Sequence, residues 1–275
     1  MIHTVNVSTL GIAGNRSGSV TLVGAGPGDP ELLTLKAVNA IGRATVLLVD
    51  DLVNDAILAH ADVQARIIHV GKRGGCQSTP QSLIEKLMIH EAVNGETVVR
   101  LKGGDPFIFG RGGEEVLHLR KAGIKVDVIN GITSGLAAAT SLDIPLTHRD
   151  QAHGVVFITG HNKPGGQGND WAALAACAHQ ASLTMVIYMG VTSADSIMEG
   201  LLKGLPGDTP VAIVQNASLS SQRHAGCVLR ELVNTIKEQK LASPSVMIVG
   251  KVASGVASIS QLNLIGLTHA HAIAA

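Results

Sequence analysis

Apolar residues along this chain gather in short runs rich in Val, Ile and Leu, which alternate with helix-length stretches of mixed polarity. Continuous apolar runs of four to six residues are typical of buried strands. Helix starts are expected at Asp29-Pro30 and at Thr79-Pro80, because Pro suits the first helical position and Asp caps helices. The alternation predicts an α/β fold with mostly parallel sheets covered on both faces. The expected strands are residues 19–23, 45–49, 67–70, 97–101, 125–129, 155–159, 183–188, 211–214 and 246–249.

The stretch 143–151 (DIPLTHRDQ) lacks a clear period and lies near the middle of the 275-residue chain. We therefore place a domain boundary there. The expected organisation is a flexible N-terminal lead at 1–17, an α/β domain at 18–145, a second α/β domain at 153–262 and a tail at 263–275.

Charge and composition narrow the class of protein. Lys plus Arg equals Asp plus Glu at 21 each, so no overall field favours nucleic acid or an anionic membrane. The apolar runs are far shorter than the roughly 20 residues of a membrane helix. The N-terminus does not resemble a signal peptide, and the three cysteines include no CxxC pair, which favours a reducing, cytoplasmic setting without a structural metal.

A glycine-rich segment, Val23 to Pro30 (VGAGPGDP), directly follows the first expected strand. A dinucleotide-binding loop needs a third glycine where Asp29 stands, and Pro27 removes a backbone donor that phosphate would need. The segment suits a ligand without phosphates, approached closely by backbone. A purely structural tight turn is the alternative.

A second motif, LKGGDPFIFGRG from Leu101 to Gly112, follows the strand at 97–101. Glycines at a strand end let backbone groups reach a ligand, and Asp105 offers a carboxylate. Glu114 lies three residues after Arg111, on the same face of the expected helix. The two side chains form either a surface ion pair or a pair that holds and deprotonates a substrate.

Basic residues at strand ends and connections form the third feature: Lys72, Arg73, His148, Arg149 and His161. Taken alone, each of these side chains is more often a solvated charge than a ligand-binding group. Converging on one cleft, they would suit a substrate with several carboxylates, which Arg binds in bidentate fashion.

Taken together, these segments resemble the uroporphyrinogen-III C-methyltransferases over about residues 18–260. The resemblance rests on VGAGPGDPELLTLKA, VGKRGG, VVRLKGGDPFIFGRGGEE, GITS, IPLTHRD, ITGH, IYMG and SPSVMIVGKV, in this order. It implies the tetrapyrrole methylase fold, with two α/β domains and an interdomain cleft, in a homodimer. It also implies two successive methyl transfers from S-adenosylmethionine to uroporphyrinogen III, giving precorrin-2 and S-adenosylhomocysteine, without a metal.

The resemblance also carries site residues over to this chain. It implies substrate contacts at Asp50, Arg111, Glu114 and Arg149, to which the basic group adds His161. Because an arginine pKa stays above about 12, we expect Arg111 to anchor carboxylate and Glu114 to accept the proton. The expected cofactor contacts are Pro27, Gly103, Gly104, Asp105, Ile108, Thr133, Ser134, Met189, Ala217 and Ser245.

Three other functions remain open at this point. A methylase of a later corrin-pathway intermediate would share the fold. A nicotinamide-dependent oxidoreductase would use the first glycine loop for pyrophosphate, which the misplaced third glycine disfavours. A non-catalytic nucleoside-binding regulator would not need Arg111, Glu114 and Arg149.

Overall fold

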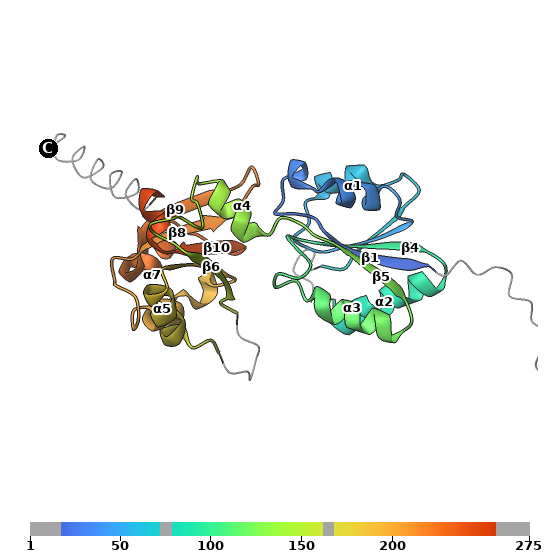
Figure 1. The fold of residues 1–275 in the computed structure, drawn as a ribbon. Coiled ribbons are helices and arrows are strands. Elements are labelled where there is room, and N and C mark those ends of the chain that lie inside the picture. The colour runs from blue at the N-terminus through green and yellow to red at the C-terminus, as the bar shows by residue number, and fades with distance from the viewer. Residues whose placement is uncertain (1–17, 72–78, 162–167, 257–275) are drawn as a thin grey trace, which may run out of the picture.

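The computed structural model describes residues 18–71, 79–161 and 168–256, arranged as two lobes that Figure 1 shows side by side. The expected lead at 1–17 and the tail at 263–275 lie outside the described residues. Each lobe is built on one five-stranded sheet. Among the described helices, none has the length and apolar character needed to cross a membrane.

The first sheet has the strand order β3-β2-β4-β1-β5, and every pairing within it is parallel. Figure 1 shows α1 on one face of this sheet and α2 and α3 on the other. Each face buries its own aliphatic cluster. The elements are β1 (Ser19–Gly24), α1 (Leu35–Ile41), β2 (Val46–Val49), β3 (Arg66–His69), α2 (Gln81–Val93), β4 (Thr97–Lys102), α3 (Gly112–Lys121) and β5 (Lys125–Ile129).

The second sheet has the order β6-β7-β10-β8-β9. One face is covered by α4, and the other by α5, α6 and α7. The elements are α4 (Ser134–Thr140), β6 (Gly154–Thr159), α5 (Trp171–Gln180), β7 (Leu183–Tyr188), α6 (Ala194–Leu201), β8 (Pro210–Gln215), β9 (Arg223–Val228), α7 (Leu232–Glu238) and β10 (Ser245–Val249).

The prediction of mostly parallel strands is confirmed for the first sheet, whereas the second sheet is mixed. Only β6 and β7 pair in parallel there, within the described residues, and the pairings β7–β10, β10–β8 and β8–β9 are antiparallel. The connection from β8 to β9 covers only residues 216–222, which is too short for the crossover that parallel neighbours require.

Short 3₁₀ turns complete the two lobes: η1 (Pro30–Leu32), η2 (Asp55–His60), η3 (Val191–Ser193), η4 (Leu229–Glu231) and η5 (Lys251–Ala253). The helix expected at Asp29 is only the turn η1, capped by the Asp29 carboxylate, which accepts a hydrogen bond from the Glu31 N–H at 2.9 Å. The α-helix itself begins at Leu35, where the Thr34 hydroxyl accepts from the Ala37 N–H.

Helix α4 belongs to the core of the second lobe, although it precedes the boundary expected at 143–151. Ala137, Ala138 and Ala139 pack with Val186 and Ile248 of the second sheet. The chain therefore passes from the first sheet to the second between β5 and α4. The expected domain limits, 18–145 and 153–262, stay a prediction.

Candidate active site

The carboxyl ends of β1, β4 and β5 meet at one edge of the first sheet, and glycines occupy the meeting point. Gly26 and Gly104 bond to each other in both directions, with N···O distances of 2.7 and 3.2 Å. Gly131 packs so closely that a Cβ there would lie 2.1 Å from the Gly104 carbonyl oxygen. Both Gly26 (φ +71°) and Gly104 (φ +67°) adopt the left-handed conformation that glycine allows without strain. At this edge the loops therefore pack backbone against backbone, which requires glycine at these positions.

Asp105 ties the loops of this edge together. Its Oδ1 accepts a hydrogen bond from the Phe107 N–H at 2.8 Å, and its Oδ2 accepts from the Gly131 N–H at 3.1 Å. The side chain is buried. A carboxylate has about four acceptor positions, so Asp105 can brace the loops and still accept from a ligand hydroxyl. Gly103 precedes this brace and packs against Leu52.

The residues expected to bind cofactor in the second lobe also share one edge of its sheet. Met189 follows β7, Ala217 follows β8, and Ser245 begins β10. Because β10 runs antiparallel to its neighbours, its start pairs with their ends: Ser245 lies opposite Gln215 and Val246 opposite Tyr188. Three segments distant in sequence thus supply one rim.

Tyr188 organises this rim, although it is not among the residues expected from the sequence. Its Oη accepts a hydrogen bond from the Gly135 N–H at 3.0 Å and lies 2.9 Å from Thr133 Oγ1. Burial raises the pKa of Tyr188, so the hydroxyl stays protonated. It thereby fixes the start of α4, where Thr133 is buried and Ser134 is half-buried. The available signal was its position as the one tyrosine of the chain, directly before Met189.

Contacts between the lobes bring the two edges face to face. The Asp29 N–H donates to Ser218 Oγ at 3.1 Å. A Cβ added to Gly28, the neighbour of the half-buried Pro27, would lie 2.6 Å from the Leu219 side chain. Ile108, in the loop after β4, packs against the core of the second lobe. All expected cofactor residues therefore lie on the two facing edges or at the start of α4.

Asp50 lies beside this region, in a cavity of about 510 Å³ between the ends of β2 and β3. Asp51, Asn54, Asp55 and His69 also line the cavity. The Asp50 side chain is 36% exposed, and its Oδ2 lies 3.3 Å from the guanidinium of Arg100. Arg100 is a further residue that the sequence did not single out, because it stands within an apolar strand.

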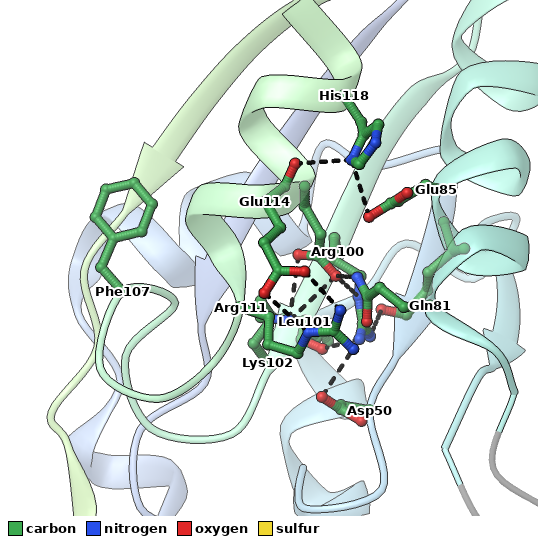
Figure 2. Close-up of polar contacts among 12 residues, drawn as sticks. Asp50, Gln81, Glu85, Arg100, Leu101, Lys102, Phe107, Arg111, Glu114 and His118 are labelled. Carbon is green, nitrogen blue, oxygen red and sulfur yellow. Dashed lines mark hydrogen bonds and ion pairs between the residues drawn. The ribbon is translucent and has the colours of Figure 1, made fainter. Parts of the chain in front are cut away.

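Arg111 and Glu114 form the ion pair that their spacing predicts, at the start of α3 (Figure 2). Arg111 Nε donates to Glu114 Oε1 at 3.1 Å. Their side chains are 55% and 53% exposed, so the pair is accessible to a ligand. The hydrogen bond that Arg111 donates to Glu114 raises the pKa of Arg111, which therefore remains a cation.

The basic residues are less closely associated. His161 is exposed at the end of β6, beside the end of β7. Arg149 is exposed in the turn between His148 and Ala152, next to a separate hollow of about 290 Å³. Lys72 and Arg73 lie outside the described residues. Convergence of this group on one cleft stays a prediction.

Within residues 18–71, 79–161 and 168–256, no group of three or more His, Cys, Asp or Glu side chains is placed to hold a metal ion. The fold and its two facing edges define an α/β protein of the class that binds small ligands at the carboxyl ends of its strands.

Comparison with known proteins identifies the family. The model of the tetrapyrrole (corrin/porphyrin) methylases matches residues 19–233. The uroporphyrinogen-III C-methyltransferase of Pseudomonas aeruginosa is 49% identical over 243 residues, covering 88% of this chain and 97% of its own. The enzyme of that name from Bacillus subtilis is 43% identical over 239 residues, covering 86% and 91%. The chain belongs to the tetrapyrrole methylase family.

A solved structure supports the same conclusion. Uroporphyrin-III C-methyl transferase from Thermus thermophilus, complexed with S-adenyl homocysteine, superposes with a TM-score of 0.72 at 40% identity. The match covers 86% of this chain and 99% of that one. Membership in this family argues against the oxidoreductase alternative. The local structure argues against it too, because Asp29 caps a single 3₁₀ turn at the place where a helix would be needed to bind pyrophosphate.

Proposed function

We propose that this protein is an S-adenosylmethionine-dependent C-methyltransferase that methylates uroporphyrinogen III twice, giving precorrin-2 and S-adenosylhomocysteine. The observation that carries the proposal is the meeting of the glycine edge of the first sheet, with its buried Asp105 carboxylate, and the Tyr188 rim of the second. A nucleoside held there would contact backbone groups and a carboxylate able to bind its hydroxyls. The close relatives named uroporphyrinogen-III C-methyltransferase support the choice of substrate.

The residues present fit the cofactor. The buried Asp105 carboxylate keeps acceptor positions beyond its hydrogen bonds to Phe107 and Gly131, and these can accept from ribose hydroxyls. The residues that would hold it are Pro27, Gly103, Gly104, Asp105, Ile108, Thr133, Ser134, Met189, Ala217 and Ser245. When bound, the sulfonium supplies an electrophilic methyl group, and in-line transfer depends on positioning and exclusion of water.

The substrate residues divide by charge. Arg111 is a permanent cation with a fork that matches a carboxylate arm of the substrate. Glu114, its partner, accepts the proton that leaves the methylated macrocycle. Arg149 and His161 bind further carboxylate arms, and Asp50 contacts the macrocycle from its own cavity.

The same proposal covers assembly and location. The protein acts as a cytoplasmic homodimer, without nucleic acid or membrane as partner. Light scattering at micromolar concentration should give twice the mass of one chain, and the mass of a single chain would contradict the dimer. Fractionation of the source cells should recover the protein with the cytoplasmic enzymes.

The decisive test is an anaerobic assay with enzymatically generated uroporphyrinogen III and S-adenosylmethionine. Mass spectrometry should show a product with two added methyl groups, and calorimetry should show S-adenosylhomocysteine binding that chelator does not change. An unmodified tetrapyrrole with intact cofactor binding would instead favour a methylase of a later corrin-pathway intermediate. That alternative is tested in the same assay by offering precorrin-2 as the substrate.

A further inference from the structure

The first lobe buries a network of charged side chains beneath the substrate side of the site. Arg100 and Lys102 on β4 are 2% and 3% exposed, and Glu115 on α3 is 0% exposed. Figure 2 shows this network between β4, α3 and α2, with Asp50 at one end. Charged side chains are almost never fully buried unless they are paired. Each of these three side chains is therefore expected to have charged or hydrogen-bonding partners.

Arg100 is held from several directions. Its Nε lies 3.4 Å from Glu115 Oε1, and its Nη1 donates to the carbonyl oxygens of Leu101 at 3.1 Å and Leu48 at 3.4 Å. The remaining nitrogen, Nη2, reaches Asp50 Oδ2 at 3.3 Å. The guanidinium therefore has a fixed orientation, with one edge inside the lobe and the other on a carboxylate that lines the cavity.

Asp50 is fixed in turn by both of its oxygens. Oδ2 accepts from Arg100, and Oδ1 accepts from the Asp51 N–H at 3.0 Å. The Asp50 N–H donates to the Leu101 carbonyl at 3.1 Å, which continues the sheet pairing beyond β2. The carboxylate is thus attached to two strands, yet remains 36% exposed to the cavity.

Glu115 anchors the opposite end. Its Oε1 accepts from Gln81 Nε2 at 2.9 Å and from Lys102 Nζ at 3.2 Å, while Oε2 lies 3.2 Å from Lys102 in an ion pair without hydrogen-bond geometry. Burial, together with the nearby charge of Arg100, lowers the pKa of Lys102. A network that disfavours one of its own cations is poor evidence for a stabilising role.

We infer that Arg100 is a positioning residue that fixes the Asp50 carboxylate toward the tetrapyrrole, with Glu115 holding the guanidinium in place and Lys102 pairing with Glu115. The inference rests on the proposed function, in which Asp50 contacts the macrocycle. A fixed carboxylate accepts hydrogen bonds from pyrrole N–H groups and repels the substrate's own carboxylate arms. It therefore favours one orientation of the macrocycle, with its nitrogens toward Asp50 and its arms toward Arg111.

The test compares Arg100→Lys, Asp50→Asn and the double variant by steady-state kinetics with uroporphyrinogen III. Lysine keeps the charge but cannot bond Glu115 and Asp50 together. We expect each single change to raise KM for the tetrapyrrole by about tenfold, the effect of losing one charged hydrogen bond. The double variant should be no worse than Asp50→Asn, because Arg100 acts through Asp50. The Kd for S-adenosylhomocysteine should stay within about twofold of wild type.

Arg66→Lys is the matched control. Arg66 lies at the other end of the same sheet, where it pairs with the buried carboxylate of Glu91 away from the cavity. The Arg66→Lys variant should leave KM for the tetrapyrrole and kcat unchanged. If Arg100→Lys does not fold, Glu115→Gln serves as a second variant. It weakens the contact that holds the same guanidinium and should also raise KM for the tetrapyrrole, by less than the tenfold expected for Arg100→Lys.

Two results would overturn the inference while leaving the proposed function intact. One is wild-type KM in Arg100→Lys; the other is a double variant whose loss is the product of the two single losses. If wild-type protein binds S-adenosylhomocysteine but never methylates uroporphyrinogen III, the proposed function fails and the inference falls with it.

Discussion

The rings of Phe109 and Tyr188 lie with their centroids 4.9 Å apart and their planes inclined at 56°, one in the loop after β4 and the other at the end of β7. This contact joins the first lobe to the rim of the second. The Tyr188 hydroxyl, on the far side of the same ring, holds the start of α4. One side chain therefore connects both lobes to the segment that carries Thr133 and Ser134.

Tyr188→Phe should weaken cofactor binding while leaving the fold intact. The ring contact with Phe109 is preserved, but the Gly135 N–H loses its acceptor. A lost neutral hydrogen bond costs about 1 kcal/mol, so the Kd for S-adenosylhomocysteine should rise about fivefold in calorimetry. Phe157→Leu alters the other ring packed on Tyr188, at 5.9 Å, and should lower stability with little effect on Kd. Equal Kd values for wild type and Tyr188→Phe would remove the hydroxyl from the site.

Gly131→Ala should abolish cofactor binding, because its Cβ would lie 2.1 Å from the Gly104 carbonyl oxygen and force apart the loops after β4 and β5. Gly113→Ala, in α3, meets nothing within 4 Å and should stabilise the helix by about 0.5–1 kcal/mol. The Tm of each variant, measured with and without S-adenosylhomocysteine, distinguishes the two substitutions. A ligand-induced rise in Tm that persists in Gly131→Ala would contradict the geometry.

Arg111→Lys and Glu114→Gln should affect different kinetic constants. Lysine keeps the cation but loses the bidentate fork, so Arg111→Lys should mainly raise KM for the tetrapyrrole. Glu114→Gln removes the proton acceptor and should mainly lower kcat. Since both side chains are more than half exposed, losing the pair should cost at most about 1 kcal/mol of stability. Wild-type kinetics in both variants would mean that the pair is only a surface contact.

Cys227 should make stability fall in alkaline solution. Burial raises the pKa of its thiol from 9.0 to about 11, so the folded state holds the proton more tightly than the unfolded state. The stabilisation is fully present below about pH 9 and is lost as the pH rises toward 11; by pH 10.5 the loss is about 2 kcal/mol. Urea unfolding at pH 8.5 and 10.5 should show this extra fall in wild type but not in Cys227→Ala. Cys177→Ala, on the exposed side of α5, should behave as wild type.

Most of the fold follows from local pattern. Of the ten strands in the described residues, nine lie where apolar runs predict them. The exception is β9, which begins with Arg223 and His224 and contains Gly226, so no apolar run marks it. The direction of the strands in the second sheet could not be predicted either. β10 lies between β7 and β8, and nothing in the sequence of β10 indicates which strands it will pair with.

The site divides in the same way. The glycine segments were predictable because a left-handed turn or a close backbone approach imposes a local requirement for glycine. The roles of Tyr188 and Arg100 arise from contacts with Gly135, Glu115 and Asp50, which the fold brings together from distant segments. Within their own strands, both residues stand among apolar neighbours and carry no signal of these partners.

The buried charges around Glu115 have an evolutionary consequence. Replacing such a network by well-packed aliphatic side chains is often neutral or stabilising, by about 1–4 kcal/mol. Removing only one of the three charged side chains, however, leaves its partners buried and unpaired, at a cost of about 3–5 kcal/mol. In a duplicated gene that is selected for folding but no longer for its biosynthetic duty, Arg100, Lys102 and Glu115 should therefore be lost together and not one at a time.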